Sequence, residues 1–395
     1  MDAADLDDVL ATVRAFVRGS VVPIEAEIDE KDEIPPAIRE AAKAMGLFGF
    51  AIPVEYGGLG LSMWEESRLV IELGYTTPSL RSMVGTNNGI AGHVLLEGGT
   101  DEQKHDWLPK IASGEVIASF ALTESEAGSD PSRLVTAACR EGDVWVITGA
   151  KRFITNAPLA DVFMVFARND PDVRATQGIT AFLVPRDTPG LTVGPRDHKM
   201  GQFGAWTADV VFDEVRVPMS SVVGGEAGVG LGFATSMRCL AHGRVHIAAL
   251  CVGMAERLVD ESVSYAQTRE QSGVTIGSFQ LIQGLIADSV TDLLAGRSLV
   301  LDVARAFDVG TDRKVGPSAA KYFASEMVGR VADRAVQIYG GSGYMRGVAV
   351  ERFYRDARLF RIYEGTSQIQ QVIIAKHVLG GAGVSRPPNT PAAPQ

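Results

Sequence analysis

The hydrophobic pattern changes its period twice along the chain, and this limits the folds available to it. Up to about residue 117, segments such as 6–19, 35–49 and 99–115 carry apolar residues at the three- and four-residue spacing of amphipathic helices. Short segments rich in β-branched and aromatic residues follow, separated by Gly, Pro, Asp and Asn, as is typical of strands and hairpins. From about residue 229 the helical spacing returns in longer segments. The pattern predicts helices, a β domain and a helical bundle, in that order.

The long apolar segments after the β region predict the longest helices. One helix is expected from 233 to about 270, before Ser272, and another from Pro317 to Tyr339. The expected domains are an N-terminal helical domain at 1–117, a middle β domain at 118–228, a C-terminal bundle at 229–380 and a disordered tail at 381–395.

Composition excludes several classes of function. The net charge of -11 argues against nucleic-acid binding as the main task, since such domains usually carry a basic face. The sequence has no run of 18 apolar residues and no signal-peptide pattern, so we expect a cytoplasmic protein without membrane spans. The three cysteines, Cys139, Cys239 and Cys251, form no C-x-x-C pair and are expected to be buried free thiols.

Common cofactor and catalytic motifs are missing. The sequence has no G-x-G-x-x-G between a strand and a helix, no phosphate-binding G-x-x-x-x-G-K-[ST] and no H-E-x-x-H. The six histidines do not follow zinc-ligand spacing, so no metal site is predicted.

One carboxylate near the C-terminus has two interpretations. Glu364 lies in RLFRIYEGTSQIQ, residues 358–370, between an aromatic residue and a Gly-Thr-Ser turn. It is either an ordinary loop carboxylate paired with Arg358 or Arg361, or a general base. Spacing alone favours the ordinary loop carboxylate.

Five strings in this order resemble the acyl-CoA dehydrogenase family over nearly the whole chain. They are FALTESEAGSD (120–130), KRFITN (151–156), FDEVRVP (212–218), QIYGGSGY (337–344) and ERFYRDARLFRIYEGTSQIQ (351–370). The resemblance implies an α+β multidomain fold with an N-terminal all-α domain, a middle β-barrel-like domain and a C-terminal four-helix bundle. It also implies bound FAD, a homotetramer built as a dimer of dimers, an acyl-CoA substrate, an electron-transfer flavoprotein as acceptor, and a role in fatty acid β-oxidation.

The resemblance also assigns the chemistry. Glu364 matches the base that takes the α-proton of an acyl-CoA thioester, while flavin N5 accepts the β-hydride to leave a trans-2-enoyl-CoA. The main-chain N–H of Glu364 and a ribityl hydroxyl of the flavin would stabilise the enolate. Some relatives carry the base immediately before a characteristic arginine, here Arg244, but this chain has Gly243 there.

The remaining site residues carry over by matching position. The flavin contacts implied by the resemblance are Phe120, Leu122, Thr123, Ser129, Phe153, Thr155, Thr366 and Gln368, joined from a neighbouring subunit by Arg269, Gln280, Gln337, Gly340 and Gly341. The implied substrate contacts are Ser129, Arg244, Tyr363, Gly365 and Arg81.

Several positions depart from the family pattern or have no family role. Ser125-Glu126 and Ala241 replace residues that usually help to admit and hold CoA. Arg81 lies close to the position of an arginine that binds the distal carboxylate in glutaryl-CoA dehydrogenases, which suggests an acidic acyl end; the alternative is a surface arginine at a helix end. His93, His242 and His246 are interpreted as packing or surface residues.

Two other functions stay open. An acyl-CoA oxidase or flavin monooxygenase of the same fold would let O₂ reach the reduced flavin. A non-catalytic flavoprotein would keep the fold after losing substrate binding, and the changes at Ala241 and Ser125 are compatible with that.

Overall fold

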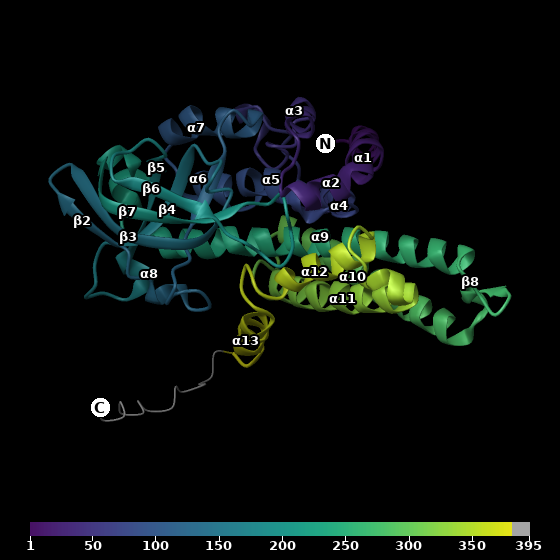
Figure 1. The fold of residues 1–395 in the computed structure, drawn as a ribbon. Helices are drawn as coiled ribbons and strands as arrows, with labels where there is room; N and C mark the ends of the chain where they lie inside the picture. Colours follow the sequence, from purple (N-terminus) through teal and green to yellow (C-terminus); the bar gives the residue numbers. More distant parts are fainter. Residues whose placement is uncertain (381–395) are drawn as a thin grey trace, which may run out of the picture.

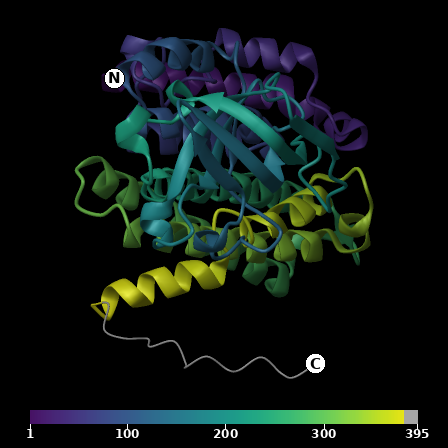
Figure 2. The same ribbon diagram turned by 90° about the vertical axis from the view of Figure 1, so that its left-hand side faces the viewer.

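The protein, seen here in a computed structural model, is described over residues 1–380. The expected disordered tail at 381–395 lies outside the described residues. The order of helices, sheet and helices predicted from the sequence is confirmed, as is the α+β fold class. Figure 1 shows the sheet at one end of the molecule and the long C-terminal helices extending away from it. In Figure 2 the sheet lies between the N-terminal helices and the C-terminal helices.

The N-terminal part is helical because its amphipathic segments carry well-formed starts and stops. Its helices are α1 (Ala3–Phe16), α2 (Glu25–Lys31), α3 (Pro36–Ala44), α4 (Met63–Gly74), α5 (Pro78–Gly85), α6 (Ala91–Gly98) and α7 (Asp101–Ser113). Ser62 and Glu65 form a capping box at the start of α4, and Thr100 and Gln103 form another at the start of α7. Gly114, with φ 73°, ends α7 in the left-handed conformation that glycine adopts easily.

The middle part is one curled, seven-stranded sheet. Its strands are β1 (Ala118–Ala121), β2 (Ala137–Glu141), β3 (Val144–Thr155), β4 (Val162–Arg168), β5 (Ile179–Pro185), β6 (Leu191–Arg196) and β7 (Thr207–Pro218). They run in the order β1-β4-β2-β3-β7-β6, and β5 pairs with β4. A four-residue helix, α8 (Ala175–Gly178), precedes β5. One apolar face packs on α6 and α7, and this places the start of β1 beside the N-terminal helices.

The C-terminal part is built around one long central helix. Its elements are α9 (Gly232–Thr268), the β8 (Glu270–Gln271) and β9 (Val274–Thr275) hairpin, α10 (Gln280–Asp308), α11 (Val315–Tyr339), α12 (Ala349–Phe360) and α13 (Ser367–Val378). Helix α9 has 37 residues and is buried on most of its circumference, since helices α4, α10, α11 and α12 all pack against it. Helices α9 and α11 correspond to the two long helices predicted from the sequence, and that prediction is confirmed.

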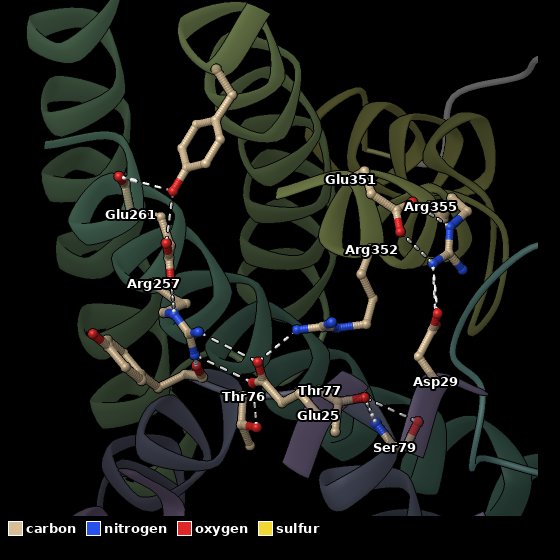
Figure 3. A network of polar contacts seen from close by, with 12 residues as sticks. Glu25, Asp29, Thr76, Thr77, Ser79, Arg257, Glu261, Glu351, Arg352 and Arg355 are labelled. Carbon is tan, nitrogen blue, oxygen red and sulfur yellow. Dashed lines mark hydrogen bonds and ion pairs between the residues drawn. The ribbon is translucent and has the colours of Figure 1, made fainter. Parts of the chain in front are cut away.

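A buried carboxylate joins the N-terminal helices to the C-terminal bundle. Glu25 of α2 accepts hydrogen bonds from Arg352 of α12 (2.6 Å), from Arg257 of α9 (3.3 and 3.4 Å) and from Thr76 (2.6 Å), as Figure 3 shows. Glu25, Arg257 and Arg352 are each less than 10 % exposed. Removing one member of such a group leaves a buried charge uncompensated, so this network fixes α12 relative to α2 and α9.

Asp356 is a second buried carboxylate on α12, and its environment favours the protonated form. It is 1 % exposed, and its Oδ1 accepts a hydrogen bond from the main-chain N–H of Gln202. Burial raises the pKa of Asp356 to about 7, although the Gln202 N–H and the charges of Arg355 and Arg352 oppose the rise.

Replacing Asp356 by Asn is expected to stabilise the protein above neutral pH. The folded-state pKa lies above the unfolded value of about 3.9, so Asp356 costs about 1.4 kcal/mol of stability per pH unit as the pH rises from about 4 to 7. The asparagine oxygen can still accept the Gln202 N–H. Urea unfolding of both proteins at several pH values should show a difference that grows with pH and vanishes near pH 4. A stability difference that does not change with pH would contradict the raised pKa of Asp356.

Two further expectations concern membranes and cysteines. Within residues 1–380, no helix combines the length and apolar character needed to cross a bilayer.

Cys239 and Cys251 are buried free thiols, as predicted, but Cys139 is exposed. The prediction is wrong for Cys139 because it lies on the outward-facing side of β2.

Candidate active site

The loop between α12 and α13 holds Glu364 in a constrained backbone conformation. Glu364 has a φ of 52° and Gly365 a φ of 88°, both in the left-handed region. The carbonyl of Glu364 accepts hydrogen bonds from Arg244 of α9 (3.5 Å) and from Gln370 of α13 (3.0 Å). The carbonyl of Gly365 accepts one from Lys321 of α11 (2.7 Å). Three helices therefore determine where this loop lies.

The carboxylate of Glu364 is turned away from solvent. Its Oε2 atom is buried and has no hydrogen-bond partner among residues 1–380. A Cβ at Gly243 of α9 would lie 2.4 Å from this oxygen, so the glycine makes room for the side chain. Burial raises the pKa of Glu364, while the positive charges of Arg81, Lys321 and Arg244 oppose the rise.

Glu364 is not an ordinary loop carboxylate in an ion pair. Arg361 pairs with Glu326 of α11 (3.2 Å), and in the described part of the chain no ion pair joins Glu364 to Arg358 or Arg361. No hydrogen bond from the main-chain N–H of Glu364 is present within residues 1–380 either. In the part of the chain that the structure describes, a buried carboxylate oxygen and the amide proton of the same residue are thus both left without partners.

Arg81 lies near this carboxylate and is not a surface residue. It belongs to α5, is 6 % exposed, and places Nη2 3.5 Å from Nδ1 of His246 on α9. The alternative of a surface arginine is wrong because every residue of α5 is buried. A surface position is also wrong for His242 and His246, which are 3 % and 0 % exposed and both contact Glu66 of α4.

The sheet brings the two strings at 120–130 and 151–156 together. The N–H of Arg152 donates to the carbonyl of Thr123 (2.8 Å), and the hydroxyl of Ser119 donates to the carbonyl of Thr155 (2.8 Å). The pairing of β3 with β7 is irregular between Lys151 and Ile154, where Phe153 has a φ of 58°. This bulge turns the ring of Phe153 outward, so that 57 % of the residue is exposed.

Other predicted residues share this edge of the sheet or the loop at Glu364. Phe120 packs on Phe166 with ring centroids 4.8 Å apart, Leu122 is buried and Ser129 is exposed. Thr366 caps α13 by accepting from the N–H of Ile369, and it brings exposed Gln368 into the first turn of that helix. Tyr363 is partly buried against Phe360, with ring centroids 5.8 Å apart.

An ion pair that the sequence analysis missed supports the 120–130 loop. Lys151 is 0 % exposed and donates to Glu124 (2.7 Å), whose carboxylate also accepts from the N–H groups of Val135 and Thr136. Burial lowers the pKa of Lys151 to about 8, against the attraction of Glu124. Strand alternation contained the signal, because the spacing from Trp145 places Lys151 on the buried face, where a lysine needs a carboxylate.

The residues expected to act from a neighbouring subunit gather at the far end of the bundle. The β8–β9 hairpin carries Arg269 at its start, and the apolar cluster beneath it joins α9, α10 and the end of α11. These residues are Arg269, Gln280, Gln337, Gly340 and Gly341, and all are exposed. In Figure 1 the β8 hairpin and strand β3 lie at opposite ends of the molecule. One chain does not bring its two groups of predicted cofactor residues together.

Comparison with known proteins covers most of the described chain. Three domain families match in succession: "Acyl-CoA dehydrogenase, N-terminal domain" at residues 4–115, "middle domain" at 119–215 and "C-terminal domain" at 230–379. The acyl-CoA dehydrogenase of Bacillus subtilis is 37% identical over 93% of this chain and 96% of its own. A 3-(aryl)acrylate reductase of Clostridium sporogenes is 38% identical over 93% of this chain and 96% of its own. Subunit CarC of the caffeyl-CoA reductase-Etf complex of Acetobacterium woodii is 38% identical over 89% of this chain and 92% of its own.

Solved structures give the same result. Butyryl-CoA dehydrogenase from Megasphaera elsdenii superposes with a TM-score of 0.90 at 32% identity, covering 95% of this chain and 98% of its own. A glutaryl-CoA dehydrogenase from Mycobacterium smegmatis in complex with FADH2 superposes with a TM-score of 0.90 at 30% identity, covering 98% and 97%. The family resemblance noted in the sequence is therefore confirmed, and this chain belongs to the acyl-CoA dehydrogenase family of oxidoreductases.

Proposed function

We propose that this protein is an FAD-dependent acyl-CoA dehydrogenase in which Glu364 removes the α-proton of an acyl-CoA thioester to give the trans-2-enoyl-CoA. The observation that carries this proposal is the buried Oε2 of Glu364, which has no hydrogen-bond partner among the described residues and lies among three cationic side chains. A carboxylate that is partly desolvated is a stronger base than one in water, as abstraction of a weakly acidic α-proton requires.

The chain's own residues suit FAD on the sheet side. The exposed ring of Phe153 offers an aromatic surface beside Thr123 and Thr155, and the ion pair of Lys151 with Glu124 holds the neighbouring loop in place. When bound, FAD supplies the acceptor for the β-hydride, at flavin N5. We assign Phe120, Leu122, Thr123, Ser129, Phe153, Thr155, Thr366 and Gln368 to its binding.

The groups around Glu364 have different roles in removing the α-proton. The carboxylate accepts the α-proton. The main-chain N–H of Glu364, which has no acceptor within residues 1–380, donates to the thioester oxygen as negative charge develops there. Arg244 and Lys321 bind the carbonyls on either side of Gly365, which keeps this N–H from turning away. The positive charges of Arg81 and Lys321 favour the ionised form that acts as base.

Replacing Gly243 by Ala is expected to slow turnover about ten- to hundred-fold, because a misplaced catalytic group costs about that much. The new methyl group would lie 2.4 Å from Oε2 and 3.2 Å from Cδ of Glu364, so the carboxylate must move. Steady-state turnover with butyryl-CoA measures the effect. Gly19→Ala is the control, since a Cβ there meets nothing within 4 Å and should leave turnover unchanged. Equal turnover in both variants would contradict the placement of Glu364.

The complete cofactor site requires a second copy of the chain. Arg269, Gln280, Gln337, Gly340 and Gly341 lie at the end of the bundle opposite the sheet, so we assign them to the FAD of a neighbouring subunit. Large apolar side chains are exposed at this end, including Leu281 at 87 % and Tyr344 at 86 %. These features support an assembly of at least two copies, and from the family resemblance we propose a homotetramer arranged as a dimer of dimers.

We propose an electron-transfer flavoprotein as the acceptor and an acyl-CoA with a polar or acidic end as one substrate class. The first rests on the relative that is named as a subunit of an Etf complex. The second rests on Arg81, a buried cation whose Nε has no hydrogen-bond partner among the described residues. A preference for glutaryl-CoA over butyryl-CoA is expected, and equal turnover of the two would exclude it.

Anaerobic titration of the purified flavoprotein with straight, branched, aromatic and dicarboxylic acyl-CoAs tests the function. Loss of the yellow flavin absorbance with at least one of them is expected. A flavin that none of them bleaches would instead indicate a non-catalytic flavoprotein. Oxygen consumption with an acyl-CoA and no added acceptor would indicate an oxidase.

A further inference from the structure

A cluster of buried polar side chains adjoins Arg81. Nε2 of His246 and Nε2 of His242 both contact Oε2 of Glu66, at 2.5 and 2.9 Å. Nδ1 of His246 faces Nη2 of Arg81 at 3.5 Å. The chain of contacts therefore runs from Glu66 on α4, through His246 on α9, to Arg81 on α5. All four side chains are less than 9 % exposed.

Arg81 is a buried cation that no carboxylate contacts directly. Within residues 1–380, no Asp or Glu oxygen lies within 4.0 Å of its guanidinium. Arginine stays protonated in proteins, so a buried guanidinium needs a negative charge nearby to offset its lost hydration. Glu364 acts on Arg81 from beyond that distance, and Glu66 reaches the guanidinium through His246.

The hydrogen bonds define the protonation state of His246. A guanidinium has only donors, so Nδ1 of His246 must accept and Nε2 must carry the proton that is donated to Glu66. The imidazole is then neutral, in agreement with the burial that lowers the pKa of His246 to about 4. A neutral imidazole in this tautomer passes polarisation from the carboxylate to the guanidinium.

The same cluster has the ligand types of a metal site, but the tautomer argues against one. Glu66, His242 and His246 could each offer one ligand atom to a divalent ion. With Nε2 of His246 protonated, no lone pair is left there for a metal. A metal-bound Nε2 would instead place Nδ1–H against Arg81, where two donors would face each other.

Two glycines allow Arg81 to reach this position. A Cβ at Gly85 would lie 2.8 Å from Cζ of Arg81, and a Cβ at Gly89 would lie 3.2 Å from its Nη2 and 3.1 Å from Nδ1 of His246. The guanidinium therefore packs directly against the backbone of the following turns. The contact between Arg81 and His246 is built into the helix packing.

We propose that Glu66 is the counter-charge of Arg81, acting through neutral His246, and that this pair sets how strongly Arg81 favours the ionised form of Glu364. Glu66 and His246 are positioning residues, since they act through Arg81. The proposal rests on the proposed role of Glu364 as base. The other titratable or charged groups that face Arg81 or the cluster are Glu65, His93, His242, Cys251, Asp308, Arg313 and Tyr363.

The two charges should move the pH dependence of catalysis in opposite directions. Arg81→Met removes the cation beside Glu364, so the acid limb of kcat/KM should move up by about one pH unit. Glu66→Gln leaves Arg81 without its counter-charge and should move the acid limb down. Glu72→Gln is the matched control and should leave the acid limb in place, because Glu72 is also a buried carboxylate of α4 but pairs with Arg14 of α1 (2.6 Å). If the two variants acted only through lost packing, Arg81→Met and Glu66→Gln would shift the acid limb in the same direction or leave it unchanged.

Thermal unfolding provides a readout that does not depend on activity. Each single variant leaves one buried charge without its partner, so Arg81→Met and Glu66→Gln should both lower the melting temperature. The double variant loses both charges and should melt above at least one of the single variants, since the two sites are coupled. Strictly additive losses would overturn the pairing, and so would one equivalent of bound zinc in the purified protein. If Glu364 is not the base, the acid limb of kcat/KM will not shift as expected. The melting temperatures of the single and double variants still test the pairing of Arg81 with Glu66.

Discussion

Replacing Glu364 by Gln is expected to lower the turnover of acyl-CoA by about two to four orders of magnitude, the usual contribution of a general base. Glutamine has nearly the same shape, so the loop bonds from Arg244, Lys321 and Gln370 should survive, as they all end on main-chain carbonyls. An amide cannot accept the α-proton at neutral pH. The visible spectrum of the purified variant should still show bound flavin, which separates loss of the base from loss of the cofactor.

Glu326→Gln provides the matched comparison for this variant. Glu326 accepts from the hydroxyl of Ser367 (2.6 Å) and pairs with Arg361 at the edge of the same loop, but it is partly exposed. Its turnover should stay within a few fold of wild type. Near-normal turnover in the Glu364 variant would remove Glu364 from the mechanism, whatever the result at Glu326.

Glu25→Gln is expected to lower the free energy of unfolding by about 3–5 kcal/mol, which is typical when one partner of a buried ion pair is removed. The change leaves Arg257 and Arg352 buried without their shared carboxylate (Figure 3). Helix α12 should loosen first, since Arg352 joins it to α2. Chemical denaturation at neutral pH measures the loss.

A surface pair on the same helix provides the control. Glu27 of α2 pairs with Lys31 at 2.7 Å, and both side chains are exposed. Exposed pairs one helical turn apart contribute about 0.3–0.5 kcal/mol, so Glu27→Gln should cost far less than Glu25→Gln. Equal losses would mean that the carboxylate of Glu25 is not the centre of the network.

Local sequence patterns predicted the helices well, because apolar spacing and end-capping bonds involve residues that are close in the sequence. The apolar spacing from 233 to 270 and the Gly that follows Tyr339 correspond to α9 and to the end of α11. Ser62 and Thr100 begin helices through bonds to residues three positions away. The assignment of Glu364 as a base followed from the match to the family strings, whereas spacing alone favoured an ordinary loop carboxylate.

Contacts between distant segments could not be predicted in this way. Nothing in the sequence near Arg81 shows that it is buried, because its partner His246 lies 165 residues later and Glu66 belongs to a different helix. Glu25 likewise meets Arg352 across 327 residues. A lone arginine or histidine has no periodic signature, so its burial depends on how whole helices pack. Lys151 is different, because strand alternation from Trp145 could have indicated its burial, although that signal was not used.

Exchange of the α-hydrogens of an acyl-CoA with solvent deuterium tests the central claim most directly. An acyl-CoA that carries no hydrogen on its β-carbon, such as phenylacetyl-CoA, isolates proton removal from the hydride step. The wild-type flavoprotein should incorporate deuterium at the α-carbon much faster than the Glu364→Gln variant, which should stay at the uncatalysed rate. Equal incorporation by the two proteins would contradict the assignment of Glu364 as the base.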